Sequence, residues 1–402
     1  MKKHFNTKAI HEGHEGFDPD SMSVPIYQSV AYPYFDAKEA AAIFSGEKPG
    51  YTYGRWDNPT VNVFEKRMAS LENAESAIAT ASGMAAIFLL AHHLLESGDE
   101  IVSSNRVYGG TFSLFAVGFK KMGVKVKWVT EPESLNAWES QITKNTKFLF
   151  VESPSNPSLF IADIPALAKL AKSKKIPLVV DNTITTPALQ VPIDLGADLI
   201  VHSTTKYICG NASSLGGIIC GSKQYVEGMR KSGMRYLGPT MAPFNAWLNI
   251  NGLETLGLRM ERHCSNAMAV AKFLENHPRV ASVNYPGLVS NPYHKMMEKQ
   301  MKGCSSLMSF ELKGTYDDAT AFIDSLEFII HATHLGTCKS IVTHPASTTH
   351  SAMGEVEMRK AGITPSLIRF SIGLEDEADL IADIKQGLEH PGKREKKTRV
   401  KS

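Results

Sequence analysis

The sequence predicts an α/β fold, with a mostly parallel sheet in a large domain and a smaller α+β domain at the C-terminal end. Between residues 78 and 221, short apolar runs alternate with stretches that have the apolar spacing of helices. Such alternation is typical of strands joined by crossover helices into a parallel sheet. Polar residues directly follow several of the apolar runs, which indicates a binding site at the carboxyl edge of the sheet.

The expected elements of the large domain follow the chain in order. Strands are expected at residues 78–81, 101–103, 124–129, 148–151, 177–180, 199–202 and 215–221. Helices are expected at residues 60–71, 85–95, from about 112, 135–142, 164–171 and 225–230. A strongly helical stretch, 243–275, leads to strands at 280–285, 306–312 and 367–372 and to helices at 317–326 and 377–388. The change from strict alternation to this pattern predicts a junction near residue 250.

The chain is therefore divided into an N-terminal arm (1–55), a large α/β domain (56–250) and a C-terminal α+β domain (251–402). The arm is rich in Pro, Gly, His and Tyr and has one helix-like run, residues 37–44. We expect its apolar side chains, such as Ile26 and Phe35, to pack against a neighbouring subunit. The charge run at 393–401 is expected to be solvated, and no function is attached to it.

Length and charge limit the class of protein. A chain of 402 residues is long enough for two or three domains with sizeable cores. Its 43 basic residues nearly balance its 41 acidic ones, and the formal net charge is +2. Because the charges nearly cancel, the protein as a whole has no electrostatic field of a single sign. The composition therefore indicates neither a nucleic acid nor a charged membrane as partner. It favours small molecules or copies of the chain itself as partners.

Cysteine usage and hydropathy predict a location. The five cysteines are odd in number and lack Cys-x-x-Cys spacing, so neither a disulfide framework nor a metal site is expected. The first residues lack the apolar core of a signal peptide, and the longest apolar patch, 85–91, is too short to span a bilayer. We therefore expect a cytoplasmic protein.

Two neighbouring strand ends carry the residues with the most distinctive chemistry. Asp181 ends one apolar run, and Ser203, Thr205 and Lys206 follow the next. A lysine at the carboxyl edge of a sheet can form a Schiff base with an aldehyde cofactor, and pyridoxal phosphate also needs an acid at its ring nitrogen and an anion site for its phosphate. In the alternative interpretation, Lys206 extends into solvent and Asp181 caps a helix.

Further turns lie on the same edge. Gly83 and Met84 open a helix directly after a strand, where free backbone N–H groups attract a phosphate. Tyr108 follows another strand and could stack on a flat ring, although a loop tyrosine is more often simple packing. Tyr53 and Arg55 lie in a segment rich in aromatic residues, 51–60, which indicates either an interface or an ordinary turn with exposed rings.

One arginine interrupts an apolar strand of the smaller domain. Arg369 lies within residues 367–372, where its charge needs a partner. That partner is either an internal acid or a ligand carboxylate, which a guanidinium can bind at two points. The second interpretation is favoured.

Taken together, the motifs resemble the cysteine/methionine-metabolism family of pyridoxal phosphate enzymes. They are Tyr-Gly-Arg-Trp-Asp-Asn-Pro-Thr, Ala-Ser-Gly-Met, Val-Tyr-Gly-Gly-Thr, Val-Asp-Asn-Thr, Ser-Thr-Thr-Lys, His-Pro-Ala-Ser-Thr-Thr-His and Leu-Ile-Arg-Phe-Ser-Ile-Gly-Leu-Glu-Asp, and they occur in the order typical of the family. The resemblance implies a fold-type I, aminotransferase-like homotetramer whose active sites are shared between two subunits.

The resemblance also implies roles for individual residues. Lys206 would hold the cofactor, Asp181 would keep its ring nitrogen protonated, and Tyr108 would stack on the ring. The phosphate would be bound by Gly83, Met84, Ser203 and Thr205, joined by Tyr53 and Arg55 from the partner subunit. Asn156 would contact the phenolic oxygen of the cofactor, and Arg369 would bind the α-carboxylate of the substrate.

Three positions bear on which member of the family the chain resembles. Gly110 stands where methionine γ-lyases usually have a reactive cysteine, and Ser113 stands where cystathionine-handling members commonly have an arginine. His334 stands where the family usually has serine or asparagine near the substrate, so it is a candidate substrate-binding residue. The resemblance is strongest to O-acylhomoserine sulfhydrylases, which implies γ-replacement on O-acetyl- or O-succinylhomoserine by sulfide or a small thiol, giving homocysteine. A γ-lyase or cystathionine γ-synthase is the alternative.

Overall fold

The computed structural model describes residues 3–14, 21–348, 358 and 363–392. Contacts divide the chain into two compact units. We call Met1–Ser153 with Ala162–Leu258 the large unit, and Pro154–Ile161 with Arg259–Ser402 the small unit. The charge run at 393–401 and the last two residues of the His-Pro-Ala-Ser-Thr-Thr-His motif, 344–350, lie outside the described residues.

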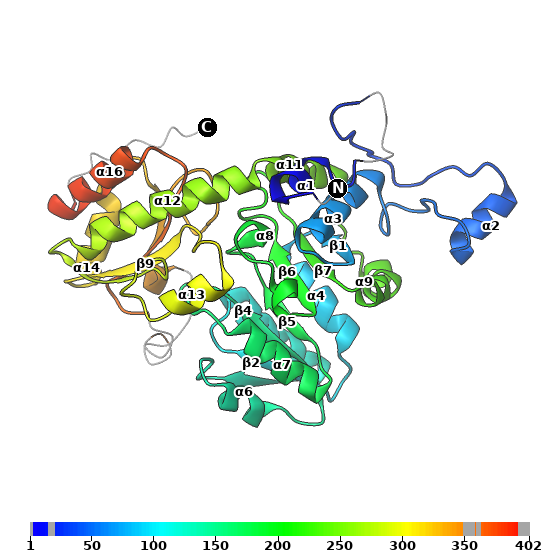
Figure 1. The fold of residues 1–402 in the computed structure, drawn as a ribbon, viewed down its shortest axis with the longest axis horizontal. Helices are drawn as coiled ribbons and strands as arrows, with labels where there is room; N and C mark the ends of the chain where they lie inside the picture. Colours follow the sequence, from blue (N-terminus) through cyan, green and yellow to red (C-terminus); the bar gives the residue numbers. More distant parts are fainter. Residues whose placement is uncertain (1–2, 15–20, 349–357, 359–362, 393–402) are drawn as a thin grey trace. The chain divides into compact units, whose positions relative to one another are not determined.

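A seven-stranded sheet forms the centre of the large unit (Figure 1). Its order is β1-β7-β6-β5-β4-β2-β3, and every pairing is parallel except those of β7 with β1 and β6. The strands are β1 (Ser76–Thr80), β2 (Glu100–Ser104), β3 (Lys125–Val129), β4 (Thr146–Glu152), β5 (Leu178–Asp181), β6 (Leu199–Ser203) and β7 (Gly217–Gly221). The predicted fold class, including the mostly parallel sheet, is confirmed.

Helices cover this sheet because its central strands are apolar on both faces. All residues of β5 are buried, and Val179 and Leu199 share a core cluster with Ile87 and Leu90 of α4. The helices are α3 (Pro59–Leu71), α4 (Gly83–Leu94), α5 (Gly109–Ser113), α6 (Leu135–Gln141), α7 (Ile164–Lys174), α8 (Thr186–Leu189), α9 (Lys223–Met229), α10 (Arg235–Leu237), α11 (Pro243–Glu254) and α12 (Leu256–Glu275), which continues into the small unit.

The parallel strands place their polar ends on one edge. β2, β4, β5 and β6 run in the same direction, so the segments that follow them leave the sheet on the same side. This edge therefore receives Tyr108, Glu152, Asp181 and Ser203. The sequence-based expectation that the reactive residues gather at the carboxyl edge of the sheet depends on this topology.

The prediction of a single helix in residues 1–55 is wrong. In addition to α2 (Ala37–Ser45), the structure has α1 (Phe5–His11), a helix without a side-chain N-cap. Tertiary contacts hold α1 in place: Ala9 is buried, and the Lys8 Nζ donates a hydrogen bond to the Ser70 carbonyl at 2.8 Å. Such contacts leave no local pattern in a helix of seven residues.

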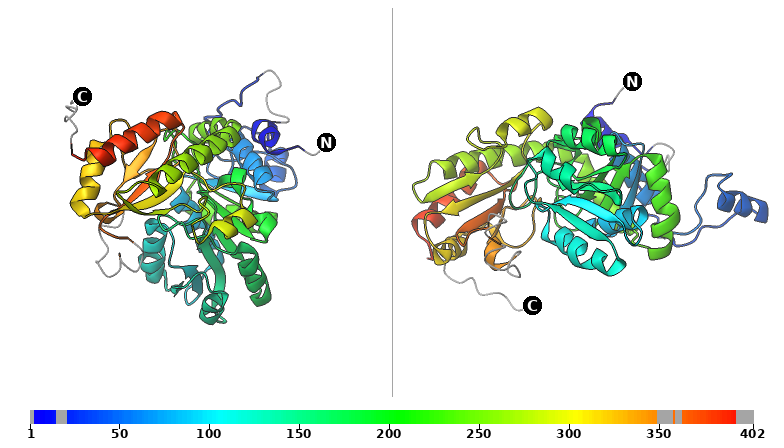
Figure 2. Two further views of the ribbon diagram at one scale, coloured as in Figure 1. Left: turned by 60° about the vertical axis from the view of Figure 1, so that its left-hand side comes forward. Right: turned by 90° about the horizontal axis from the view of Figure 1, so that it is seen from below.

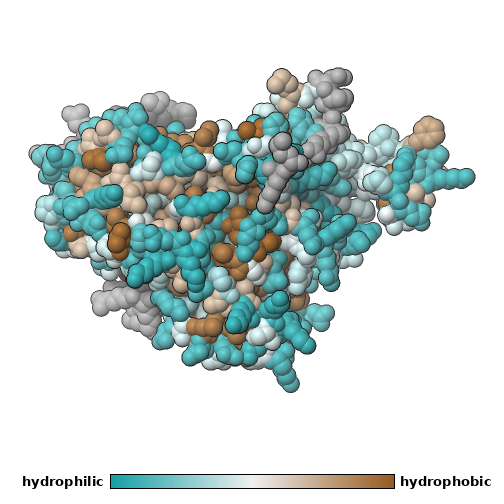
Figure 3. Space-filling model, in the orientation of Figure 1, coloured by the Kyte–Doolittle hydropathy of each residue, from teal (hydrophilic) through white to brown (hydrophobic). Residues whose placement is uncertain are grey.

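By contrast, α2 lies away from the other elements of the large unit, as Figures 1 and 2 show. None of its residues is buried, and the flanking Phe35 is 92% exposed. Phe44 within α2 is 62% exposed, and apolar atoms are visible on this segment in Figure 3. Aromatic side chains exposed to this degree are typical of a surface that another chain covers.

The small unit contains a five-stranded sheet in the order β10-β11-β12-β9-β8. β10 and β11 are parallel, and the other pairs are antiparallel. The strands are β8 (Val280–Asn284), β9 (Leu307–Leu312), β10 (Ile330–His331), β11 (Ile341–Thr343) and β12 (Leu367–Ser371), and the helices that accompany them are α13 (His294–Gln300), α14 (Tyr316–Ser325) and α16 (Glu377–Glu389). Arg369 lies in the middle of the sheet, opposite Thr343 on β11 and Ser309 on β9.

Hydropathy gives no membrane-spanning helix. Within the part of the chain that the structure describes, no helix combines the length and the apolar character needed to cross a bilayer.

A glycine in α11 permits close packing against the turn that follows β6. A Cβ added to Gly252 would lie 2.9 Å from the Cys209 carbonyl oxygen and would also overlap the Ile208 carbonyl oxygen. Alanine favours a helix by roughly 1 kcal/mol over glycine, but overpacking against backbone costs about 1–3 kcal/mol. We therefore expect Gly252→Ala to lower the free energy of unfolding, as measured by urea denaturation.

Gly118→Ala is the matched control. A Cβ there would meet only the end of the flexible Leu114 side chain, at 3.0 Å. Its stability should stay within about 0.5 kcal/mol of the parent. Equal stability of the Gly252→Ala protein and the parent would contradict the steric argument.

Candidate active site

A hydrogen-bonded turn holds Lys206 beyond the end of β6. The Lys206 N–H donates to the Ser203 carbonyl at 3.3 Å, and the Lys206 carbonyl accepts from the Gly210 N–H at 2.8 Å. The Thr204 N–H donates to the Gly216 carbonyl at 3.0 Å, which joins the turn to the segment before β7. Lys206 itself is half-buried. Its amine is therefore carried by a fixed backbone and not by a mobile loop.

Asp181 is a buried acid at the end of β5. Its side chain is 8% exposed, and Oδ1 accepts hydrogen bonds from the N–H of Thr183 at 3.0 Å and from its hydroxyl at 2.5 Å. Burial raises the pKa of Asp181, and both bonds from Thr183 and the electrostatic interaction with His202 oppose that rise. Among the described residues, Oδ2 of Asp181 accepts no hydrogen bond. That oxygen is available to a donor from a ligand.

Thr183 is a candidate site residue that the sequence analysis does not assign. While its hydroxyl donates to Asp181, the same oxygen accepts the Ser203 N–H at 2.9 Å. Thr183 therefore joins the ends of β5 and β6. A signal was present in the sequence, because an aspartate that accepts from the N–H two residues later forms an Asx-turn, and threonine at that position can add its hydroxyl.

The start of α4 and the end of β6 form a cradle for an anion. A Cβ on Gly83 would lie 2.7 Å from the Ser203 Cβ and 2.9 Å from its Cα, so the close approach requires glycine. Ser82 caps the helix by accepting the Ala85 N–H at 3.1 Å. The backbone N–H groups of Gly83 and Met84 thus begin a helix of twelve residues beside the Ser203 hydroxyl.

Thr205 lies on the same turn, but its hydroxyl is bound to the backbone of Gly216. Its Oγ1 accepts the Gly216 N–H at 3.1 Å and donates to the Gly216 carbonyl at 3.3 Å. In this arrangement the hydroxyl of Thr205 braces the turn.

Tyr108 lies at the same edge, before α5. Its ring is 48% exposed, and its N–H donates to Glu152 Oε2 at 2.6 Å. A Cβ on Gly110 would come within 2.5 Å of Cε1 of the Tyr108 ring, so this ring position depends on glycine. The exposed face of an aromatic ring can stack on a planar cofactor.

Tyr53 and Arg55 are not brought to this cradle by their own chain. Both are exposed, and the Arg55 guanidinium carbon lies 5.1 Å from the centre of the Tyr53 ring. Among the described residues, no hydrogen bond joins either side chain to Gly83 or Ser203.

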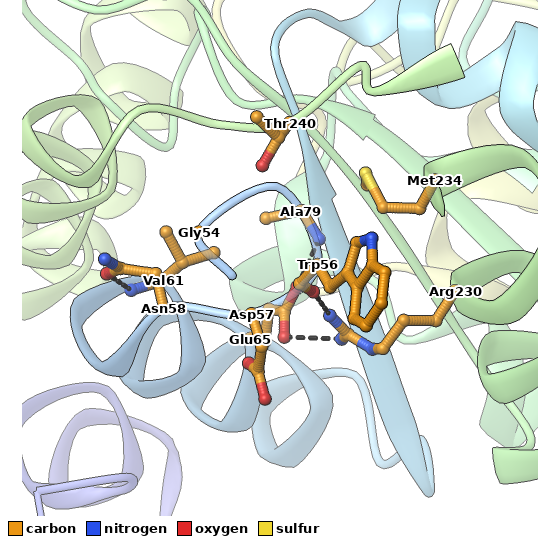
Figure 4. Close-up of a pocket in the computed structure, with 10 residues that line it drawn as sticks. All are labelled: Gly54, Trp56, Asp57, Asn58, Val61, Glu65, Ala79, Arg230, Met234 and Thr240. Atoms are coloured by element: carbon orange, nitrogen blue, oxygen red, sulfur yellow. Dashed lines mark hydrogen bonds and ion pairs between the residues drawn. The ribbon is translucent and has the colours of Figure 1, made fainter. Parts of the chain in front are cut away.

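The loop that carries them is anchored firmly (Figure 4). Arg230 donates to the Trp56 carbonyl and to Glu65 Oε2, both at 2.7 Å, and Glu65 Oε1 accepts the Ala79 N–H at 2.8 Å. Burial raises the pKa of Glu65, and Arg230 opposes that rise. A small pocket lies between these residues and Thr240. The anchoring fixes the direction of the exposed Tyr53 and Arg55.

The small unit holds a buried arginine site. Arg369 is 3% exposed, and its Nη1 donates to Asn156 Oδ1 at 3.1 Å. Its Nη2 donates to the His334 carbonyl and to the Thr343 hydroxyl, both at 3.1 Å. These three acceptors orient the guanidinium, and His334 takes part through its backbone carbonyl.

The residues of the large unit fit pyridoxal phosphate. A lysine on a fixed turn, a buried acid with one available oxygen, an exposed aromatic ring and an anion cradle are the groups that this cofactor needs. Together with the mostly parallel sheet, they define an α/β enzyme of the pyridoxal phosphate class.

Comparison with known proteins shows the family to which this chain belongs. The family described as Cys/Met metabolism PLP-dependent enzymes matches residues 6–389, and the chain belongs to it. The chain is 44% identical to an O-succinylhomoserine sulfhydrylase of Pseudomonas aeruginosa, over 96% of this chain and 95% of that one. It is 42% identical to an L-methionine gamma-lyase of Pseudomonas putida, over 96% and 97%.

A solved structure agrees with this assignment. A Campylobacter jejuni protein assigned as an O-acetylhomoserine (thiol)-lyase is 40% identical and superposes with a TM-score of 0.93, over 96% of this chain and all of that one. That structure carries N'-pyridoxyl-lysine-5'-monophosphate. The protein is a pyridoxal phosphate-dependent enzyme, as the sequence predicts.

The role of Thr183 is testable by removing its hydroxyl. Thr183→Val removes one of the bonds that oppose the raised pKa of Asp181, so the carboxylate should take up its proton at a higher pH than in the parent. Because hydrogen bonds to charged groups contribute about 1.5–3 kcal/mol, cofactor affinity should fall at least about tenfold. The loss should deepen as the pH falls. Titration of the apoenzyme with cofactor at several pH values measures it.

Thr183→Ser is the matched control, since it keeps the hydroxyl and loses only a methyl group. It should bind the cofactor with an affinity close to that of the parent. Weak binding by the serine variant and the valine variant alike would contradict the role of the hydroxyl.

Proposed function

We propose that this enzyme joins sulfide, or a small thiol, to O-acetyl- or O-succinylhomoserine and releases homocysteine and the acyl carboxylate. In this γ-replacement the Cγ–O bond breaks and a C–S bond forms. The observation that carries the proposal is the likeness to an O-succinylhomoserine sulfhydrylase along nearly the whole chain. The substrate is a small amino acid, in keeping with the family.

The large unit supplies the groups for proton transfer. Bound pyridoxal phosphate withdraws electrons from the substrate Cα. We assign Lys206 as the residue that holds the cofactor and then moves protons at Cα and Cβ. Asp181, held by Thr183, accepts the hydrogen bond of the ring nitrogen through Oδ2. Tyr108 stacks on the ring.

The phosphate and the substrate carboxylate have separate sites. Gly83, Met84 and Ser203 bind the phosphate. Thr205 lies beside the phosphate and also stabilises the turn through its hydrogen bonds with Gly216. In the small unit, Arg369 binds the α-carboxylate of the substrate, since Asn156 and Thr343 already orient its guanidinium. The contact of Asn156 with the cofactor and a substrate contact of the His334 side chain remain predictions.

Replacement is favoured over elimination because Gly110 stands where methionine γ-lyases usually have a reactive cysteine. Ser113 supplies no positive charge for a distal carboxylate, and sulfide needs none. The alternative is a γ-lyase, which the likeness to the gamma-lyase of Pseudomonas putida supports.

Assembly and location belong to the same proposal. Exposed Tyr53, Arg55 and Phe35 support an arm that crosses to a neighbouring subunit, in a homotetramer whose active sites are shared between two chains. The five free cysteines, three of them buried, support a reducing cytoplasm.

A turnover panel tests the reaction. The purified enzyme is given O-acetylhomoserine, O-succinylhomoserine, cystathionine or methionine, each with and without sulfide. We expect homocysteine from an acylated homoserine only when sulfide is present, measured against ketobutyrate as the product of elimination. Ketobutyrate from methionine as the main product would overturn the proposal in favour of the γ-lyase.

Lys206→Ala is the control for that panel. It should fold like the parent, fail to trap the cofactor on borohydride reduction, and show no turnover with any substrate. Full activity of this variant would contradict the role of the lysine.

The shared site is tested by mixing subunits. Arg55→Ala should weaken cofactor retention, and Lys206→Ala should be inactive. When the two are mixed and allowed to exchange, an intact site forms wherever Lys206 of one chain meets Arg55 of another, so about a quarter of the sites should recover.

Each variant subjected to the same exchange with itself is the control. No recovery in the mixture, despite mass-spectrometric proof of mixed assemblies, would argue against sites shared between subunits.

A further inference from the structure

A fully buried carboxyl–imidazole couple, Glu72 and His202, lies near the ends of β5 and β6. Glu72 and His202 are both 0% exposed, and Glu72 Oε1 lies 2.6 Å from His202 Nε2. The same oxygen accepts a hydrogen bond from the Asn182 side-chain amide at 3.0 Å. The functional roles assigned above use neither Glu72 nor His202.

The couple is positioned from two elements. Glu72 follows α3 as its C-cap, and its N–H donates to the Met68 carbonyl at 3.0 Å. His202 is the penultimate residue of β6. A carboxylate removed from water costs several kcal/mol unless it is paired and hydrogen-bonded. The imidazole and the amide provide that compensation at Oε1, whereas Oε2 of Glu72 and Nδ1 of His202 are buried without a hydrogen-bond partner among the described residues.

The register of the sheet places the couple behind Asp181. Asp181 on β5 lies opposite Val201 on β6, so His202 is one residue further along. Because successive side chains of a strand point to opposite faces, His202 projects from the face opposite that of Asp181. Burial raises the pKa of Asp181, and the electrostatic interaction with His202 opposes that rise.

We propose that Glu72 holds His202 as an imidazolium, and that this charge keeps Asp181 ionised so that it can bind a protonated cofactor ring nitrogen. Glu72 and His202 are thus positioning residues that act through Asp181. The proposal rests on the placement of the ring nitrogen at Asp181 in the proposed function. Its chemistry is a matter of charge alone, since no covalent bond changes.

The other titratable groups around the couple do not supply this charge. Cys220 lies on β7, and burial, with additions from Glu72 and Glu65, raises the pKa of its thiol well above the usual value. Cys220 is therefore neutral. Glu65 on α3 is paired with Arg230. Between Glu72 and Asp181, His202 is the group that can carry a positive charge.

The test variant removes the carboxylate charge of Glu72 and keeps the shape of its side chain. Glu72→Gln preserves a hydrogen-bond acceptor for His202 but removes the carboxylate. In the holoenzyme reconstituted with pyridoxal phosphate labelled with ¹⁵N in the ring, the ¹⁵N shift should move from the protonated toward the unprotonated nitrogen. The cofactor dissociation constant should rise about tenfold, a loss of ~1.4 kcal/mol. Glu72→Asp, which keeps the charge, should restore the protonated signal.

Glu100→Gln is the matched control. Glu100 is a buried carboxylate at the start of β2, 6% exposed, and it accepts a hydrogen bond from the Thr143 hydroxyl at 2.6 Å. Its ¹⁵N signal should equal that of the parent. A ring nitrogen that stays fully protonated in a folded Glu72→Gln enzyme would overturn the proposal.

Two further measurements keep the outcomes separate. If Glu72→Gln does not fold, the histidine ¹⁵N spectrum of the parent holoenzyme, assigned with His202→Gln, decides: a neutral His202 overturns the proposal and an imidazolium supports it. Asp181→Asn tests the underlying placement. If Asp181→Asn leaves the ring nitrogen unchanged, the assignment of Asp181 fails; if only Glu72→Gln leaves it unchanged, the couple alone is refuted.

Discussion

The hydrogen bonds of one hydroxyl group connect the two halves of the candidate active site. Thr183 donates to Asp181 and accepts from the Ser203 N–H, so the strand that ends in the acid is joined to the strand that leads to Lys206. The acid, the anion cradle and the lysine are therefore held by one sheet edge. Pyridoxal phosphate is bound at its ring nitrogen, its aldehyde carbon and its phosphate. The groups that bind these three points must therefore be held at fixed distances from one another.

Close backbone approach is the second constraint on this edge. Gly83 lets the start of α4 approach Ser203, and Gly252 lets α11 approach the turn after Lys206. Gly110 leaves room for the ring of Tyr108. A methyl group at Gly83 or Gly252 would push apart two segments that the site needs together, and one at Gly110 would displace the Tyr108 ring. The absence of side chains thus shapes this site as much as the reactive groups do.

Three buried acids of the large unit each have hydrogen-bonding partners. Glu65 is paired with Arg230, Glu72 contacts His202 and Asn182, and Asp181 is bound by Thr183. Each compensating partner comes from an element distant in sequence or from the next turn of chain. Because an unpaired buried charge is costly, these contacts fix the register of α3 against the sheet as well as the electrostatics of the site.

By itself the sequence determined the parallel sheet, its seven strands and the edge on which the reactive residues gather, because apolar periodicity and strand-end polarity are local properties. It also determined the family, through motifs whose residue types the chemistry demands. Only the tertiary structure revealed α1, the double contact of Thr183 and the couple of Glu72 with His202, since Glu72 and His202 lie 130 residues apart. Such contacts depend on how strands and helices pack, and no local pattern encodes them.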